Sequence, residues 1–293
     1  ASRGRACTHN IYLIYGMRIV HGLTVSAIVV SKRAYFIDLY TGDRLKHYLS
    51  LFTIVWSTGP IMAPFVGGYL EQLFGWQSNF YFLAIFSFAL LLLEWIFSGE
   101  TLSYFAPFRI QRITVVYIRM IRTLPFMLGL LRGGLADGMV MVYNMTGPCI
   151  IEHGLHLSPV IAGYASLVLG IAWMTGGFIG KTTIRRPFFK RVMINMLFQA
   201  IFVTVMLISI RSISNVYALI FFAFIIQVAA GYTFNNFYTY CLTRFPKNAG
   251  IASGFTGGAN YVIISLVSSI IVFFLPAKDE YNLGFSYLIL ILA

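Results

Sequence analysis

Four charged side chains lie inside long apolar stretches of this sequence: Arg18, Glu94, Arg132 and Asp137. A charge within a bilayer is costly, so such residues are candidates for handling protons or charged substrates. Asp137 lies near the middle of its stretch, and a low-dielectric environment favours the protonated form of a carboxylic acid. We therefore expect Asp137 to bind and release a proton or to hold a cationic substrate. A carboxylate that only satisfies its structural neighbours is the alternative.

The other three charges also have competing interpretations. Arg18 lies about a third of the way into the first apolar stretch, where it either has a functional role or bonds backbone carbonyls as a structural cation. Arg132 and Asp137 are separated by about 140° round a helix. The two would therefore pair poorly within one helix, and Arg132 could extend to the cytoplasmic interface instead. Glu94 lies near the end of its stretch and is either an interfacial residue or a third candidate for proton coupling.

Polar and aromatic residues recur in the later apolar stretches. They could line a cavity for bulky amphipathic or cationic ligands, through apolar contact and cation–π attraction. They could equally bond neighbouring helices, which is common in membranes. The candidates for a substrate cavity are Tyr143, Asn144, Gln227, Asn235, Asn236 and Tyr238.

Other site chemistries find little support. The three cysteines are far apart, which argues against a disulfide framework or a cysteine zinc site; they are Cys7, Cys149 and Cys241. The range 152–156 brings Glu152, His153 and His156 close in sequence, but it lacks the H-E-x-x-H order and a third strong ligand. We expect no metal and no cofactor. A membrane-embedded enzyme such as an acyltransferase would need a clustered nucleophile or His/Asp constellation, which is not seen, so an enzyme is not expected.

The elements that position these residues are membrane helices. Of the 293 residues, 59% are apolar and 10% are charged, whereas soluble domains hold about a quarter charged residues. Runs of about 20 apolar residues cross a bilayer as helices, so we expect an all-α membrane protein with about eight full spans and a partial one. The expected spans are Ile11–Val30, Tyr48–Leu70, Phe80–Phe97, Leu124–Ile151, Val160–Gly180, Val192–Ile210, Val216–Tyr240, Gly250–Leu275 and the partial Leu283–Ala293.

The gaps between these spans predict the orientation. Nearly all of their Lys and Arg residues fall in alternate gaps, which the positive-inside rule places in the cytoplasm. The net charge of +12 therefore reflects topology, and no nucleic-acid partner is expected. Residue 1 is expected outside, so an odd number of spans upstream would restore a cytoplasmic N-terminus. In the longest gap, basic residues at 109, 112, 119 and 122 recur at helical spacing and predict either a helix on the anionic inner leaflet or a solvated linker.

The second span contains an unusual stretch, Thr58–Gly68, in which glycine and proline alternate with apolar residues. Gly59, Ala63 and Gly67 are four apart and would form one smooth stripe on a helix. In water these residues would break a helix, but in a bilayer a small-residue stripe allows a neighbouring helix to approach closely. A tightly packed, kinked helix is the simpler interpretation, and a moving helix–helix contact in a transporter is the sharper one.

Several ordered motifs resemble the major facilitator superfamily, specifically the drug:proton antiporter branch of the bicyclomycin-resistance type. Arg18-Ile-Val-His-Gly22 resembles the R-x-x-Q-G element of the fourth helix, with His21 where Gln is usual. This resemblance implies a role for Arg18 in proton coupling. Phe245-Pro246 before Ala249 resembles the entry into helix eleven. The second span resembles the fifth-helix antiporter motif of this family, through Gly59, Pro60, Pro64, Gly67 and Gly68.

This resemblance implies a major facilitator fold of which the chain holds helices four to twelve, truncated at both ends. The implied domains are 1–98, the rest of an N-terminal six-helix bundle; 99–123, a basic cytoplasmic linker; and 124–293, a C-terminal six-helix bundle with an incomplete last helix. The resemblance also implies a monomeric multidrug antiporter of the inner (cytoplasmic) membrane. It would export drug-like small molecules in exchange for protons by alternating access, with the lipid bilayer as its surroundings. An importer, a metabolite or siderophore exporter of the same fold, or an inactive fragment are the alternatives.

Overall fold

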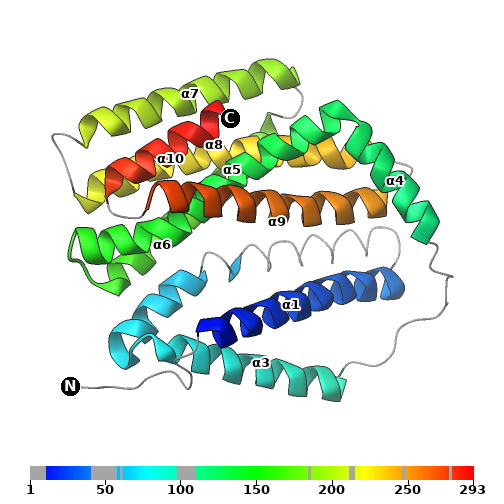
Figure 1. Cartoon of the computed structure of the whole chain (residues 1–293), viewed down its shortest axis with the longest axis horizontal. Coiled ribbons are helices and arrows are strands. Elements are labelled where there is room, and N and C mark those ends of the chain that lie inside the picture. Colours follow the sequence, from blue (N-terminus) through cyan, green and yellow to red (C-terminus); the bar gives the residue numbers. More distant parts are fainter. Residues whose placement is uncertain are drawn as a thin grey trace. The chain divides into compact units, whose positions relative to one another are not determined.

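The computed structural model describes residues 11–40, 58–59, 62–97, 110–183, 186–210, 215–245, 249–276 and 279–293. Cys7 and Pro60 lie outside these residues. The regular structure described is entirely helical (Figure 1), which confirms the all-α prediction. Its elements are α1 (Ile11–Leu39), a helical segment at 62–74, α3 (Gln77–Phe97), α4 (Ile110–Arg122), α5 (Leu124–Cys149), the π-helical turn η1 (Ile150–Gly154), α6 (Pro159–Thr182), α7 (Phe188–Ser209), α8 (Val216–Thr243), α9 (Ala249–Phe274) and α10 (Glu280–Leu292).

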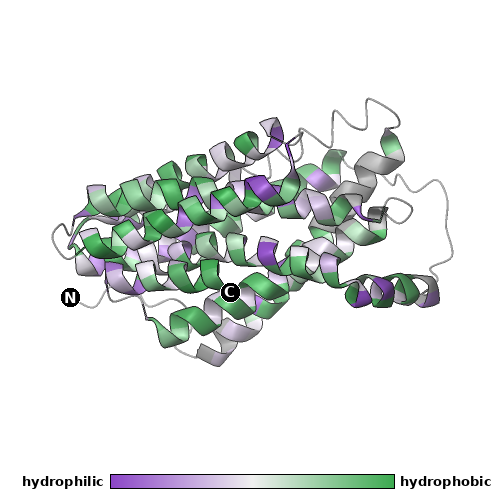
Figure 2. Cartoon of the chain, turned by 90° about the horizontal axis from the view of Figure 1, so that it is seen from above, coloured by the Kyte–Doolittle hydropathy of each residue, from purple (hydrophilic) through white to green (hydrophobic). Residues whose placement is uncertain are grey.

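Six of the described helices are long and apolar enough to cross a membrane, and Figure 2 shows the predominance of apolar residues along them. They correspond to six of the expected spans, with boundaries shifted by a few residues. The predicted partial span corresponds to the shorter apolar helix Glu280–Leu292. The predicted first span lies within α1, and of the predicted second span the structure describes only 58–59 and 62–70.

The chain divides into two compact units. The first holds residues 1–63 and 69–108, and the second holds Pro64–Gly68 and Arg109–Ala293. In the second unit α5 to α10 form one bundle, and residues from all six of these helices share a hydrophobic core. The predicted division at 98 and 123 stays a prediction.

Local chemistry explains where several helices of the second unit begin. Prolines occupy the first turns of α5 and α6, where the missing N–H costs no intrahelical bond. The Asn215 side chain accepts from the Ala218 N–H, and Asp279 accepts from the Asn282 N–H, so both cap a helix. At the other end of α5, Pro148 interrupts the helical hydrogen bonds just before the π-helical turn.

Within the basic gap, Ile110–Arg122 form the helix α4, as the spacing of the arginines predicts. One face of α4 buries Val116 and Met120 in a second cluster that includes Phe126 of α5 and Ala252 of α9. Arg119 and Arg122 lie in its last turn and are exposed. The contact of this helix with the anionic leaflet stays a prediction.

Glycines allow α6 and α8 to touch backbone to backbone. A Cβ added at Gly176 would clash with the Val228 carbonyl, and one added at Gly231 would clash with the Trp173 carbonyl. Such close packing of small residues stabilises helix pairs in a bilayer, where no hydrophobic effect drives helices together. Close packing against α6 therefore fixes the position of α8 within the bundle.

Candidate functional site

The charged residue at the middle of α5 faces a neutral amide. Asn260, near the middle of α9, donates from Nδ2 to Asp137 Oδ2 at 3.0 Å. Asn260 is buried, with 6% of its surface exposed, and Asp137 is half-buried. Two helices far apart in sequence are thus joined by a charge-assisted hydrogen bond at membrane depth.

Gly134 makes this contact possible. A Cβ added there would lie 2.5 Å from Ile263 Cγ2 and 3.4 Å from Asn260 Oδ1. The absence of a side chain therefore lets α9 approach α5 one turn before Asp137, which brings the Asn260 amide within reach of the carboxylate.

The neighbouring cation does not neutralise Asp137. Arg132 instead donates from Nη1 to the Ile291 carbonyl near the end of α10, at 3.4 Å. Helices α8 and α9, which flank α5, contain no Asp, Glu, Lys, Arg or His. Within the described part of the chain, the hydrogen bond to the Asp137 carboxylate therefore comes from the neutral Asn260 amide and not from a cation.

A second polar contact joins α7 to α8. Asn195 donates from Nδ2 to the Ala229 carbonyl at 2.8 Å and to Thr233 Oγ1 at 2.9 Å. One turn later, Gln199 donates from Nε2 to the Ile226 carbonyl at 3.0 Å and to the sulfur of Met139 at 3.1 Å. All of these partners are neutral.

A small cavity lies beside the α7–α8 contact. It measures about 20 Å³ and is lined by Arg132, Gln199 and Thr233 together with apolar residues of α5, α7 and α10. A space of this size holds about one water molecule. It cannot hold a drug-sized ligand.

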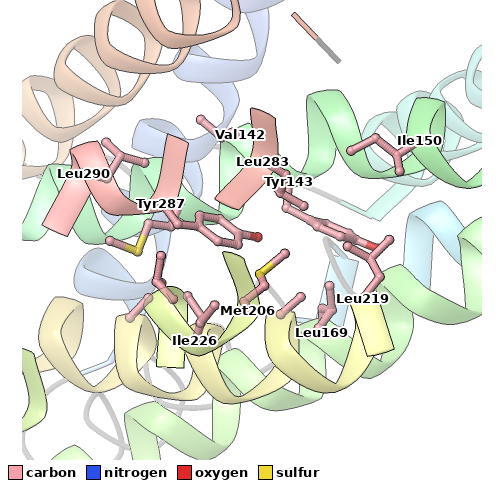
Figure 3. Close-up of a cluster of buried hydrophobic side chains, with 14 of the residues drawn as sticks. Val142, Tyr143, Ile150, Leu169, Met206, Leu219, Ile226, Leu283, Tyr287 and Leu290 are labelled. Carbon is pink, nitrogen blue, oxygen red and sulfur yellow. The ribbon is translucent and has the colours of Figure 1, made fainter. Parts of the chain in front are cut away.

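The predicted cavity residues fall into separate environments. Tyr143 and Gln227 are fully buried, and Figure 3 shows Tyr143 among apolar core side chains together with Tyr287 of α10. The hydroxyls of Tyr143 and Tyr287 and the Gln227 Nε2 have no hydrogen-bond partner among the described residues. Substrate could reach these groups only if the helices around them parted. Asn144, on the same helix, is exposed.

The other predicted cavity residues gather where α8 faces α6. Asn235 and Asn236 lie against Gly180, where an added Cβ would be 3.3 Å from Asn235 Oδ1 and 3.2 Å from Asn236 Nδ2. Beside them Phe234 stacks on Tyr238, with ring centroids 5.2 Å apart. Trp173 of α6 lies 5.2 Å from Phe234 in turn. These aromatic rings and Asn235 are half-buried, whereas Asn236 is buried and donates from Nδ2 to the Tyr232 carbonyl. This aromatic and amide region is the described part of the chain closest in chemistry to the predicted cavity wall.

Part of the predicted antiporter motif packs on α6 within the second unit. A Cβ added at Gly68 would lie 2.6 Å from the Pro159 carbonyl oxygen. Phe65 contacts Tyr164 edge to face, with centroids 5.0 Å apart. Gly59 belongs to the first unit and has open space around it among the described residues. Within the second unit, the close approach to α6 involves Gly68 and the backbone of Pro64 and Phe65.

In the first unit, Arg18 lies over the ring of Phe80, 5.4 Å from its centroid. Both Arg18 and Glu94 are exposed within that unit. Their predicted part in proton coupling stays a prediction. Among the described residues, no three His, Cys, Asp or Glu side chains come close enough to hold a metal ion.

Sequence reasoning missed several polar residues that the structure brings together. Asn260 and the pair Asn195 and Gln199 each interrupt an apolar span, and the pair is four residues apart on one helical face. The same signal that singled out Asn235 was therefore available for them. Glu280, which is buried at the start of α10, was missed because it lies next to a loop in the sequence.

Comparison with known proteins identifies the family. Residues 4–269 match the model of the Major Facilitator Superfamily. The chain belongs to this superfamily. It is accordingly a multi-pass membrane transporter rather than an enzyme, with a small-molecule substrate and a lipid surrounding.

Three relatives illustrate the similarity. The chain is 26% identical to the "Uncharacterized MFS-type transporter YdgK" of Bacillus subtilis (strain 168), over 91% of this chain and 67% of that protein. It is 22% identical to an "Uncharacterized transporter" of Rickettsia bellii (strain RML369-C), over 89% of this chain and 68% of that protein. A "Bicyclomycin resistance protein homolog" of Haemophilus influenzae is 35% identical, over 24% of this chain and 17% of that protein.

Proposed function

We propose that this transporter exports drug-like or amphipathic small molecules in exchange for protons, as a monomer in the inner membrane. The observation that carries the proposal is Asp137, a carboxylate at the middle of α5 whose described hydrogen-bond partner is the neutral amide of Asn260.

A coupling carboxylate has to gain and lose its proton at low energetic cost. A carboxylate paired with a buried cation resists protonation, because protonation would leave that cation unpaired. Asp137 has no such partner among the described residues, since Arg132 bonds a carbonyl of α10. Protonation of Asp137 therefore removes a buried charge without creating another one.

The substrate class is proposed from the surface formed by α6 and α8. Trp173, Phe234 and Tyr238 form a continuous series of rings beside the amides of Asn235 and Asn236. Aromatic faces attract amphipathic and cationic molecules, and amides orient them. The resistance protein homolog is in keeping with an exported drug, although that similarity covers a short segment.

The moving contact of the cycle is proposed at Pro64–Gly68 on α6. The tight approach of Gly68 to Pro159 leaves no room for a side chain. Packed interfaces of this kind switch between discrete arrangements rather than deforming gradually. A shift of α6 would also move Trp173 and the aromatic surface proposed for the substrate.

The test is proton-coupled efflux by the full-length protein in inverted membrane vesicles, with Asp137→Asn compared with the wild type. We expect the substitution to lower proton-driven efflux by at least about tenfold and to abolish its pH dependence, because an amide cannot release a proton. Asp279→Asn is the matched control, since Asp279 is an exposed capping residue that Asn can replace. Unchanged efflux and pH dependence in Asp137→Asn would remove Asp137 from the mechanism.

A further inference from the structure

The amide of Asn260 can form a hydrogen bond with Asp137 in both of its protonation states. We propose that Asn260 is a positioning residue that sets how readily Asp137 binds and releases its proton. The inference rests on the proposed function of Asp137 as the coupling group, and no comparison assigns a role to Asn260.

The geometry of the amide supports this role. Nδ2 donates to Asp137 Oδ2 at 3.0 Å, while Oδ1 faces α5 at Gly134. An asparagine offers both donors and an acceptor. When a hydronium ion gives one proton to Asp137 and becomes water, the new O–H of Asp137 can donate to Oδ1 after a rotation of the amide. One proton is gained by Asp137, and no other side chain changes charge.

The surroundings leave few other groups to control Asp137. The only ionisable side chain of α9 is Tyr261, which is 62% exposed. The other elements packed against α5 bring the described ionisable side chains Tyr117, Arg119, Arg122, Glu152, His153, Tyr164, Lys181, Tyr217, Tyr232, Tyr238, Tyr240, Cys241, Glu280, Tyr281 and Tyr287, and α5 itself has Arg132, Tyr143 and Cys149. Among described residues the structure shows no ion pair or hydrogen bond between Asp137 and any of these. Among the described residues, Asn260 is thus the group that bonds the Asp137 carboxylate directly.

The test measures protonation directly, independently of transport. The infrared band of the protonated carboxyl is followed against pH in the purified full-length protein in lipid, and the Asp137→Asn protein identifies the part due to Asp137. In Asn260→Leu, which preserves side-chain size but removes the amide, we expect the midpoint to rise by about one pH unit or more, because the carboxylate loses its donor. Asn260→Gln keeps an amide, so its midpoint should rise less than that of Asn260→Leu.

Asn195→Leu is the matched control. It makes the same chemical change at an amide of α7 that bonds only the neutral partners Ala229 and Thr233, so the midpoint should not move. If Asn260→Leu does not fold, Asn260→Ala takes its place. An unchanged midpoint in the Asn260 variant, an equal shift in Asn195→Leu, or no titrating band from Asp137 would overturn the proposal.

Efflux measured on the same variants separates the two proposals. If Asn260→Leu shifts the Asp137 band while Asp137→Asn keeps normal pH-dependent efflux, the role of Asn260 stands and proton coupling by Asp137 fails. If Asp137→Asn abolishes efflux while the band midpoint of Asn260→Leu is unchanged, proton coupling stands and the role of Asn260 fails.

Discussion

Two amide contacts in the second unit look alike and differ in one respect. At the α5–α9 contact Asn260 donates to a carboxylate, whereas at the α7–α8 contact Asn195 and Gln199 donate to carbonyls, a hydroxyl and a thioether. Both contacts satisfy polar groups within a membrane bundle. Only the first contains a group that can change its charge.

This difference indicates that, within one bundle, some polar contacts affect only stability whereas others also affect the pH dependence of transport. A neutral contact contributes the same bond at every pH, so its loss should lower stability without changing the pH dependence of transport. A contact with a carboxylate changes with protonation, so its loss should alter both. The predictions below test this division, beginning with the largest expected effect.

Gly134→Ala should have the largest effect, because its new Cβ would meet the Ile263 side chain and push α9 away from Asp137. We expect unfolding in detergent to become easier by about 1–3 kcal/mol and efflux to fall roughly tenfold. The control is Gly258→Ala on α9, where an added Cβ has open space. Equal efflux in the two variants would show that the close approach of α5 and α9 is not needed.

The bundle itself was largely predictable from hydropathy, because each span must be long and apolar to cross the bilayer. The helical character of the basic gap was predictable from the spacing of its arginines. The π-helical turn after α5 was not predicted, although Pro148 is visible in the sequence. Backbone rearrangement after a proline depends on how the freed carbonyls find partners, and those partners come from tertiary packing.

Gln199→Leu should have an intermediate effect that is confined to stability. Its Nε2 bonds the Ile226 carbonyl and the Met139 sulfur in a buried setting, and interhelical bonds of this kind contribute about 0.5–2 kcal/mol each. We expect a loss of about 1–2 kcal/mol in the free energy of unfolding, measured by denaturation in mixed micelles, and no change in the pH profile of efflux. Thr204→Val is the control, since the Thr204 hydroxyl is exposed and bonds only the Ala200 carbonyl of its own helix. A shifted pH profile in Gln199→Leu would break the division between the two contacts.

The candidate site was only partly predictable. Asp137 stands out because it is charged within a span, but its partner is neutral and lies 123 positions away. Which of several mid-span amides meets the carboxylate depends on how α5 and α9 pack. The two helices pack closely at Gly134 because a side chain there would clash with Ile263. Tyr143 and Asn144 are adjacent in sequence, yet one is in the core and the other is exposed. Helix rotation separates them, and a span that is apolar all round gives little information on its rotation.

Arg132→Gln should have the smallest effect, and it tests whether Asp137 has a hidden counter-charge. Arg132 makes one long hydrogen bond, 3.4 Å to the Ile291 carbonyl, and lines the water-sized cavity beside Gln199. A glutamine can still donate there, so we expect a loss of under about 1 kcal/mol in stability. The midpoint of the Asp137 infrared band should also stay in place, because removing a cation that does not bond the carboxyl alters its protonation far less than removing its direct donor. If the midpoint rises as much as in Asn260→Leu, the positive charge of Arg132 stabilises the Asp137 carboxylate by electrostatic attraction without a direct bond. Asp137 would then be stabilised by the positive charge of Arg132 as well as by the Asn260 amide. The pH sensitivity that distinguishes the α5–α9 contact from the neutral α7–α8 contact would depend on both residues.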